Sequence, residues 1–375
     1  MNMTAQEAPG AYGRLPIVPQ APTDGKRQGS TGPSFRGLSV GCRRGTLCTM
    51  NVEFHYYAIY ALAREAGFTD DFAFRMACSS QYVDAATSPL SFDAPRGRTE
   101  MIVTQNYVFW DDSTRNDVYL PFHFLPGNAR AAASLRSDST RNPYAVTPNG
   151  EIAKRLLTEA FRDKDPYLMG IAAHAFCDTW AHQNFSGLME SWNDLGTGSA
   201  AGSLPPAGHL HALAAPDEPD RRWMDSRLKP EARSIVNRDR YREAARKIFR
   251  YFRVFLARPF DDDELVVDRL SEIWLEPSRE GRLAEYTIRY DATPWDAALW
   301  RRSAGAPIDG SALSGIRHYD KYAWAKSELA RALRGGEAKI IPVGSELYAS
   351  DLYRWNEAAI EHRRRAQAAI AAEGL

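Results

Sequence analysis

Hydrophobic and polar residues recur with the period of an α-helix over most of the chain from Met50 onward. The segment MNVEFHYYAIYALAREAGF is rich in aromatic and aliphatic residues and stops at Gly67, the residue type that most often terminates a helix. Next comes Thr69 followed by two aspartates, a composition typical of an N-cap and first turn, which predicts a second helix as far as about Asp84. These patterns predict an all-α fold.

Helical periodicity returns after residue 146. The segment TPNGEIAKRLLTEAF predicts one helix, and DPYLMGIAAHAFCDTWAHQNFSGLMESW predicts another, with Pro166 near its first position, where proline is tolerated. Four or five further helices are expected over about 230–257, 262–275, 279–290, 319–334 and 346–373. We expect residues 50–375 to form one multi-helix bundle.

Two stretches interrupt this pattern. Residues 98–127 contain the β-branched and aromatic run TEMIVTQNYVFW and the run VYLPFHFLPGN, which ends in a Pro-Gly turn, so a short irregular or β-like excursion is expected there. Residues 194–229 are rich in glycine and proline and are expected to form a long connection.

The first 49 residues have a different composition. They hold eight glycines, five prolines and six basic residues against two acidic ones, without apolar periodicity. Such a segment buries too little apolar surface to offset the entropy that is lost on ordering. We expect either a disordered tail with a targeting or regulatory role, or residues that precede the true start of translation at Met50.

The 47 basic residues of the chain balance its 47 acidic residues. The chain therefore lacks the overall positive charge typical of proteins that bind duplex nucleic acid or anionic membranes. No apolar run approaches the roughly 20 residues needed to span a bilayer, and no secretory signal is visible, so a cytoplasmic location is expected. The four cysteines have spacings that match neither a zinc ribbon nor a redox motif, and we expect free thiols.

The most specific chemical pattern lies in the segment IAAHAFCDTWAHQNF. It places His174, Asp178 and His182 four residues apart, so that they share one stripe of a helix. Four helical residues advance about 6 Å, which puts the two histidines about 12 Å apart, too far to share one ion through bonds of about 2.1 Å. A carboxylate between them has two oxygens. The spacing therefore predicts two ions, with Asp178 bridging one held by His174 and another held by His182.

Two ions need more ligands than one helix supplies. Other histidines and aspartates stand in segments where an unpaired polar side chain would be costly to bury. The predicted ligands are His55, Asp84, His123, His174, Asp178, His182, His209 and His211. Asp84 and Asp178 are also the predicted catalytic residues, and Asp217 is a weaker candidate ligand in the loop of the last two histidines. His318 and His362 lie among charged residues and are expected at the surface.

These segments resemble a known group of enzymes. AAHAFCDTWAHQNF is similar to the central helix of the superfamily of zinc-dependent phospholipases C and single-strand-specific nucleases. The spacing His-x3-Asp-x3-His within it, with Asn-Phe shortly after the last histidine, most resembles the Het-C-like branch of that superfamily. NVEFHYYAIYALAREAGF, SSQYVDAA, PFHFLPGN, HAFCDTWAHQNFSG and GHLHA also resemble, in that order, an uncharacterised bacterial family of domains of unknown function placed with the same superfamily. The resemblance covers most of residues 50–225.

The resemblance implies an all-α enzyme with metal ions held by histidine and aspartate. Asp84 and His123 would match the carboxylate and the histidine that precede the central helix, and His209 or His211 would match a late ligand. The enzymes of the superfamily use a free N-terminal tryptophan as a ligand, whereas here His55 would replace the ligand near the mature N-terminus. The last histidine of the central helix also follows its aspartate more closely here than in those enzymes.

Chemistry and resemblance together predict a hydrolase with two or three zinc ions, with manganese or iron as alternatives. The expected substrate is a phosphodiester: a phospholipid headgroup, a nucleic acid or a smaller molecule. Zero net charge favours a lipid or a small molecule over a polynucleotide. Two other functions remain open, namely a metalloenzyme of another, oxidative type and an interaction or effector protein in which metals only hold the fold.

Overall fold

The helix predicted after Met50 is present and begins as a π-helix. The computed structural model describes residues 52–87, 89–106, 108–196, 204–305 and 339–375. In it, η1 (Glu53–Ala58) continues directly into α1 (Ile59–Ala66). Gly67 follows with a φ of +106°, a left-handed conformation that glycine adopts without steric cost, and it ends the helix where the sequence predicts.

Side-chain caps define where the next long helices begin. Thr69 precedes α2 (Asp70–Ala85), and its side chain accepts a hydrogen bond from an amide of the first turn. α6 (Glu151–Asp163) and α7 (Pro166–Ala181) follow the predicted periodicity. Asp165 caps α7 by accepting hydrogen bonds from two amides of its first turn. The starts of these helices agree with the sequence-based prediction, but α7 ends at Ala181, well before the end of the predicted segment at Trp192.

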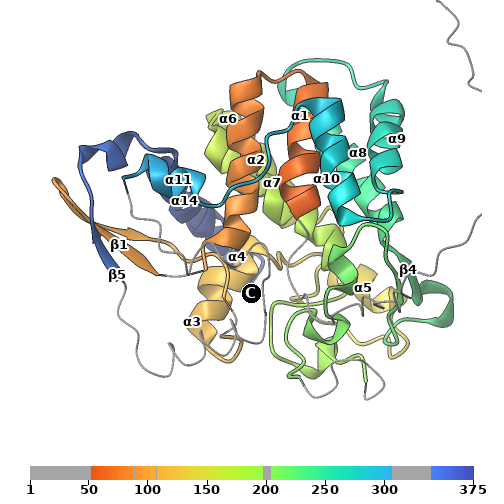
Figure 1. Ribbon diagram of the computed structural model, residues 1–375. Coiled ribbons are helices and arrows are strands. Elements are labelled where there is room, and N and C mark those ends of the chain that lie inside the picture. The colour runs from red at the N-terminus through yellow and green to blue at the C-terminus, as the bar shows by residue number, and fades with distance from the viewer. Residues whose placement is uncertain (1–51, 88, 107, 197–203, 306–338) are drawn as a thin grey trace, which may run out of the picture. The chain divides into compact units, whose positions relative to one another are not determined.

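A small sheet stands near the predicted excursion, but it begins before residue 98. β1 (Leu90–Ala94) pairs antiparallel with β2 (Gly97–Met101), and β5 (Lys339–Pro342) pairs parallel with β1 (Figure 1). The chain then becomes helical in α3 (Asp112–Thr114), η2 (Arg115–Tyr119) and α4 (Leu120–Phe122). The prediction of an irregular or β-like segment is therefore wrong for residues 112–122, where the side chain of Asp111 caps the helical turn.

Most of the predicted C-terminal helices are present. Four predicted ranges hold α8 (Asn237–Phe255), α9 (Asp263–Ile273), α10 (Arg279–Tyr290) and α14 (Asp351–Ala372). α8 starts later than predicted because β4 (Ser234–Val236) precedes it and pairs with β3 (Arg222–Met224). α5 (Ala129–Leu135) and α11 (Leu299–Ser303) are short helices that the pattern did not predict. Residues 319–334 and 1–49, for which a helix and a tail were expected, lie outside the described residues.

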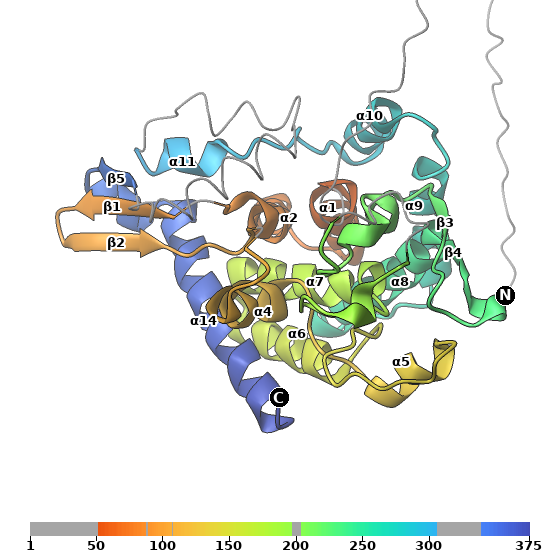
Figure 2. The ribbon, with the colours of Figure 1, turned by 90° about the horizontal axis from the view of Figure 1, so that it is seen from below.

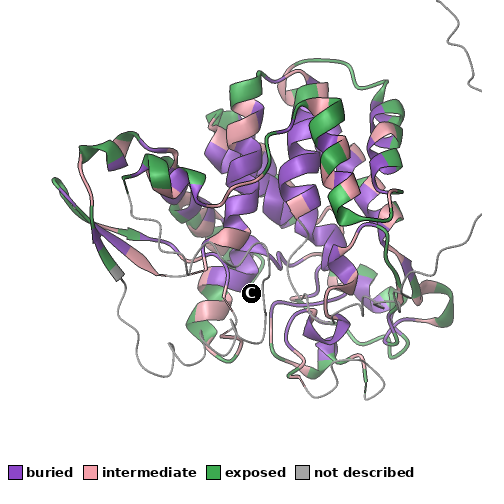
Figure 3. Cartoon of the chain, viewed as in Figure 1, coloured by how far each residue is buried: buried purple, intermediate pink, exposed green. Residues whose placement is uncertain are grey.

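α7 is the central helix of the unit formed by residues 45–375, to which all described residues belong. It is apolar on all sides, and every residue from Tyr167 to Ala181 is buried. α2, α6, α8 and α14 pack around it (Figure 2), whereas α9 and α10 each expose an outer face (Figure 3). Among the described helices, none has both the length and the apolar character needed to cross a membrane.

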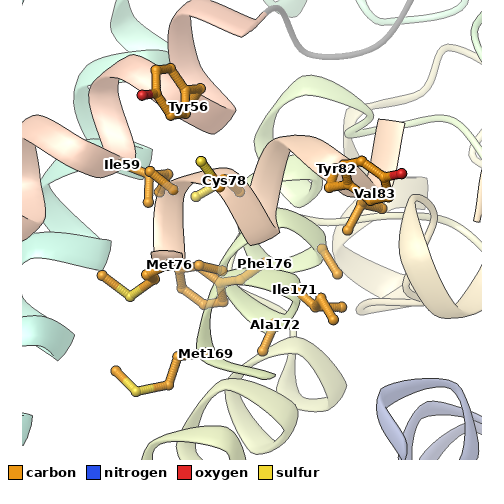
Figure 4. Close-up of a cluster of buried hydrophobic side chains, with 14 of the residues drawn as sticks. Tyr56, Ile59, Met76, Cys78, Tyr82, Val83, Met169, Ile171, Ala172 and Phe176 are labelled. Carbon is orange, nitrogen blue, oxygen red and sulfur yellow. The ribbon is translucent and has the colours of Figure 1, made fainter. Parts of the chain in front are cut away.

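The interface of α2 and α7 is one continuous apolar cluster. Met76 of α2 and Phe176 of α7 are both fully buried in it (Figure 4). Cys78 and Cys177 are buried free thiols, as predicted, and the other two cysteines lie outside the described residues. The predicted metal ligands of α7 therefore project from a helix whose position is fixed by packing.

The prediction that His362 lies at the surface is wrong. α14 packs against α4 and α7 and turns His362 inward, so that only 1% of the residue is exposed. Its Nε2 donates a hydrogen bond of 3.0 Å to the carbonyl of Pro121, and its ring lies near Phe122. The neighbouring Arg364 is exposed, because adjacent positions of a helix face different sides. The other histidine expected at the surface, His318, lies outside the described residues.

Burial of His362 predicts a pH-dependent stability. It lowers the pKa of the imidazole from 6.5 to about 4, despite the hydrogen bond to Pro121. Because the unfolded chain binds a proton that the folded chain excludes, the free energy of unfolding should fall as the pH drops from 6.5 toward 4. This one group should cost about 2 kcal/mol between pH 7.5 and pH 5.

Urea unfolding in the presence of a chelator measures this effect. His362→Gln has no imidazole to protonate, so its stability should fall by about 2 kcal/mol less than that of the wild type over the same pH interval. Equal losses in both proteins would contradict the prediction.

Candidate metal centre

The histidines and the aspartate of the central helix lie close together, as the four-residue spacing predicts. His174 Nε2 is 3.3 Å from Asp178 Oδ2, and His182 Nδ1 is 3.7 Å from the same oxygen. α7 ends at Ala181, so His182 is the C-cap residue and leaves the regular helical path. The side chains of all three residues are at most 2% exposed.

Three other elements bring predicted ligands to Asp178. His55 of η1 places Nε2 at 3.1 Å from Asp178 Oδ1, and its ring stacks on His174 at 3.8 Å between centroids. His123, which follows α4, places Nδ1 at 3.1 Å from Asp178 Oδ2. Asp84, near the end of α2, places Oδ1 at 3.7 Å from His174 Nε2 and at 4.0 Å from His123 Nδ1. Asp178 therefore lies between two ligand groups, one on each carboxylate oxygen.

A third group forms around His182. Its ring stacks on that of His209 at 4.8 Å between centroids, and His209 Nε2 is 3.9 Å from Asp217 Oδ2. Potential ligand atoms lie within 4.8 Å of one another in three sets: His55, His174 and Asp178; Asp84, His123 and His174; and His182, His209 and Asp217. We expected His182 to share an ion with Asp178. Instead it belongs to the third set, because the ring nitrogen nearer to Asp178 bonds to the His123 carbonyl at 2.7 Å.

The structure brings together seven of the eight predicted ligands, and the exception is His211. Its Nδ1 is 3.1 Å from Asp194 Oδ1, and its Nε2 is 2.7 Å from the carbonyl of Leu204. His211 stands two residues from His209, but a single-turn helix, η4 (Leu210–Ala212), turns it away from the three sets.

Replacing His211 should leave metal binding intact. Both ring nitrogens are engaged outside the three sets, so His211→Asn is expected to keep the wild-type metal content per chain. His209→Asn is the matched variant, since it removes a member of the third set from the same loop and should lower the metal content. Mass spectrometry of both purified proteins makes the comparison, and a metal loss on replacing His211 would contradict this assignment.

Hydrogen bonds to backbone carbonyls set the tautomers of three of these histidines. His123 Nε2 faces the carbonyl of Thr104 at 2.8 Å, His182 Nδ1 faces that of His123 at 2.7 Å, and His209 Nδ1 faces that of Leu213 at 3.1 Å. A carbonyl accepts only, so each of these nitrogens carries the proton and the opposite nitrogen of a neutral ring carries a lone pair. A histidine that donates one N–H to a carbonyl while its other nitrogen is bare is typical of metal sites.

With neutral rings, nitrogens and carboxylate oxygens of this group face one another without a proton between them. In its neutral form His123 directs the Nδ1 lone pair at Asp178 Oδ2 across only 3.1 Å. Three further buried nitrogens, His55 Nδ1, His174 Nδ1 and His182 Nε2, have no hydrogen-bond partner among the described residues. Lone pairs that converge in a buried space repel one another unless a cation lies between them.

The charges of these side chains would also be balanced by a bound cation. Burial lowers the pKa of His174 and His182 below the ordinary value, which leaves both rings neutral at neutral pH. Burial alone would raise the pKa of Asp178, but interactions with the surrounding histidines outweigh it and hold this pKa well below its usual value. An ionised carboxylate beside the neutral rings of His174 and His182 carries negative charge that a bound metal ion would balance.

The donor atoms fit zinc in kind and in spacing. Two donors on one tetrahedral zinc, each at about 2.0–2.1 Å, lie about 3.4 Å apart. The separations between the histidine nitrogens and carboxylate oxygens range from 3.1 to 4.0 Å. Nitrogen and carboxylate donors suit zinc, and also manganese and iron. The residues of the three sets could therefore hold such ions.

Several residues that the sequence did not single out support these ligands. Thr104 fixes the ring of His123 through its carbonyl. Gln81 donates a hydrogen bond to Asp84 Oδ2 at 3.3 Å, one helical turn earlier on α2. At the start of α8, the Asn237 amide bonds to carbonyls on both sides of Asp217, and Tyr241 donates to the Asp217 carbonyl at 2.7 Å. Thr104, Asn237 and Tyr241 act across tertiary contacts, which no local pattern marks, whereas Gln81 acts within α2.

A separate cavity of about 600 Å³ lies beside the loops that follow two of the ligands. Gly127 lines it after His123, and Gln183 and Asn184 line it after His182, but none of the predicted ligands reaches it. Among those ligands that the three sets contain, His209 is the most exposed, at 12% of its side chain, against 0–5% for the others. The third set is therefore the one nearest to solvent.

Residues 50–370 match the model of a protein family described as a family of unknown function (DUF6765). The chain belongs to this family. The match covers all elements that carry the ligands as well as the C-terminal helix α14. No curated protein and no solved structure matches the chain.

Proposed function

We propose that this member of the DUF6765 family is a metal-dependent hydrolase that acts on phosphodiesters through a multinuclear zinc site. The observation that carries the proposal is the pair formed by His123 Nδ1 and Asp178 Oδ2, which are 3.1 Å apart with the ring proton on the opposite side. In the neutral form of His123, two electron pairs face each other at this distance inside a group with 0–5% exposed side chains, and a bound cation would relieve their repulsion.

The three sets differ in the number of donors that they offer. The set around His123 has four when Asp178 Oδ2 is added to Asp84, His123 and His174. A neutral imidazole has one lone pair, so His174 then leaves two protein donors, His55 and Asp178 Oδ1, in the set that it shares. The set of His182, His209 and Asp217 has three protein donors. Structural zinc sites are filled by four protein ligands, whereas catalytic sites keep a position for water or substrate. Three ions with incomplete protein coordination at two of them thus favour catalysis over a purely structural role.

The residues of the chain have distinct tasks in this proposal. Asp178 binds at two metal positions, one through each carboxylate oxygen, and its burial keeps competing water away. Asp84 keeps Oδ1 directed at His123 and His174 while Gln81 orients Oδ2, which suits it as a ligand and as an acceptor of a proton from water. Ions bound at such sites supply positive charge that stabilises a phosphodiester in its transition state and activate water at neutral pH.

Access favours approach of the substrate at the third set, where His209 is partly exposed. Phe124 stacks on His182 at 4.5 Å, and Phe185 lies edge-on to His209 at 6.2 Å, so the surroundings are apolar. Zero net charge of the chain adds no general attraction for polynucleotides. These features favour a lipid or small organic phosphodiester.

The test begins with metal content per chain, measured by mass spectrometry on protein purified without an affinity metal. Two or three equivalents of zinc are expected, together with cleavage of a chromogenic phosphodiester that a chelator abolishes and zinc restores. Phosphatidylcholine vesicles and single-stranded DNA then separate the substrate classes. Less than one equivalent per chain would refute the metal site. Full loading without cleavage of any of these substrates, with unfolding upon chelation, would favour the structural role instead.

A further inference from the structure

Three of the long-range hydrogen bonds of α14 end on one stretch of the chain, residues 100–121. Asn356 Oδ1 accepts from the amide of Ile102 at 2.8 Å, and its Nδ2 donates to the carbonyl of Glu100 at 3.1 Å. His362 Nε2 donates to the carbonyl of Pro121 at 3.0 Å. Both side chains are 1% exposed, and both reach a segment more than 240 residues away in sequence.

These contacts lie on both sides of His123. Ile102 stands two residues before Thr104, whose carbonyl accepts the Nε2–H of His123 and so sets its tautomer. Pro121 stands two residues before His123 itself. Its carbonyl belongs to the last turn of α4, where helix carbonyls have no partner within the helix, and His362 supplies that partner. Ring orientation and backbone position of His123 are thus both tied to α14.

Part of this segment has little structure of its own. Residues 102–106 have no regular secondary structure, and α4 is the last turn of a helical run that begins at Asp112. The ring of His362 also packs near Phe122, at 5.4 Å between centroids, and α14 contacts both α4 and α7. His174 and Asp178 are fixed by a central helix, whereas His123 depends on contacts from elsewhere.

We propose that His362 and Asn356 are positioning residues for the metal ligand His123, so that α14 keeps this imidazole aimed at Asp178 and Asp84. The inference rests on the proposed metal site and assigns the C-terminal helix a role in it. Loss of a residue that orients a metal ligand lowers metal affinity by about 10-fold to 100-fold. His362→Phe keeps a ring against Phe122 but removes the N–H, whereas His362→Gln keeps a donor.

The experiment titrates metal-free protein with Co²⁺ alone and follows the visible absorption of the bound ion. His362→Phe should bind its tightest Co²⁺ about 10-fold more weakly than the wild type, and His362→Gln should recover most of that affinity. Gln367→Ala is the matched control. It removes two other hydrogen bonds of α14 to the same segment, at Asn116 and Asp117, neither of which adjoins His123 or Thr104 in sequence, and should leave affinity unchanged.

Thermal unfolding of the metal-free variants shows whether each remains folded at the titration temperature. If His362→Phe does not fold, Asn356→Asp takes its place, because it keeps the acceptor for Ile102 and loses only the donor to Glu100. Wild-type Co²⁺ affinity in a folded His362→Phe or Asn356→Asp protein would overturn the inference. Failure of the wild type to bind Co²⁺ would instead overturn the proposed function on which it rests.

Discussion

Asp178→Asn is expected to remove two metal ions from the protein at once. The carboxylate places Oδ1 at 3.1 Å from His55 and Oδ2 at 3.1 Å from His123. Asparagine keeps the shape of the side chain but has no charge and only one oxygen, so it cannot serve both positions. The affinity of these two positions should fall by more than the roughly 100-fold that follows loss of a supporting residue.

The set of His182, His209 and Asp217 should keep its ion in this variant, since none of its members depends on Asp178 as a ligand. Metal content per chain, measured by mass spectrometry, should therefore fall to one equivalent. Asp194→Asn is the matched control, because Asp194 also pairs with a histidine but lies outside the three sets. Unchanged metal content in Asp178→Asn would contradict a bridged site.

Stability separates loss of metal from loss of fold. Without metal, the surrounding histidines hold the pKa of Asp178 well below its usual value, so the ionised carboxylate stabilises the folded state at neutral pH. The metal-free Asp178→Asn protein should therefore be less stable than the metal-free wild type. Zinc should raise the melting temperature of the wild type more than that of the variant, because binding to the folded state alone stabilises it.

Gly170→Val is expected to be the most destabilising single substitution in the helical core. Gly170 lies where α7 crosses α2, and a Cβ there would stand 2.2 Å from the carbonyl oxygen of Met76 and 2.7 Å from Ser79 Cβ. Backbone atoms cannot move aside as a flexible side chain does, so the two helices would have to separate. The overpacking should cost about 3 kcal/mol or more in the free energy of unfolding.

Two further variants bracket this prediction. Gly170→Ala adds only the clashing carbon and gains about 1 kcal/mol of helix propensity, so it should be destabilising by about 2 kcal/mol. Ala368→Val places the same valine on an exposed position of α14 and should cost only about 0.5 kcal/mol. Urea unfolding of the three metal-free variants gives the comparison. A Gly170→Ala protein as stable as the wild type would show that the interface accommodates the side chain.

Packing at Gly170 should also affect the metal site that contains Asp178. α2 carries Asp84 and α7 carries His174 and Asp178, and the close approach at Gly170 sets the distance between the two helices. A partial separation of α2 from α7 should therefore weaken metal binding even in molecules that remain folded. Metal content of Gly170→Ala at a temperature where it is folded tests this link.

Local sequence was sufficient wherever the physical cause is local. The caps at Thr69 and Asp165, the left-handed Gly67 and the apolar periods define α1, α2, α6 and α7, because helix formation depends on neighbours within one or two turns. The four-residue spacing likewise placed His174 and Asp178 in contact, since helical geometry alone brings positions i and i+4 together.

The sequence by itself therefore determined that the chain is mainly helical and narrowed the candidate metal ligands to a few histidines and aspartates, of which His211 was wrong. Only the tertiary structure decided how they are grouped. It pairs Asp178 with His55 and His123 and assigns His182 to a separate set, and it turns His211 away and His362 inward. These outcomes depend on contacts between segments far apart in the chain, whose relative placement is fixed by packing rather than by any spacing along the sequence.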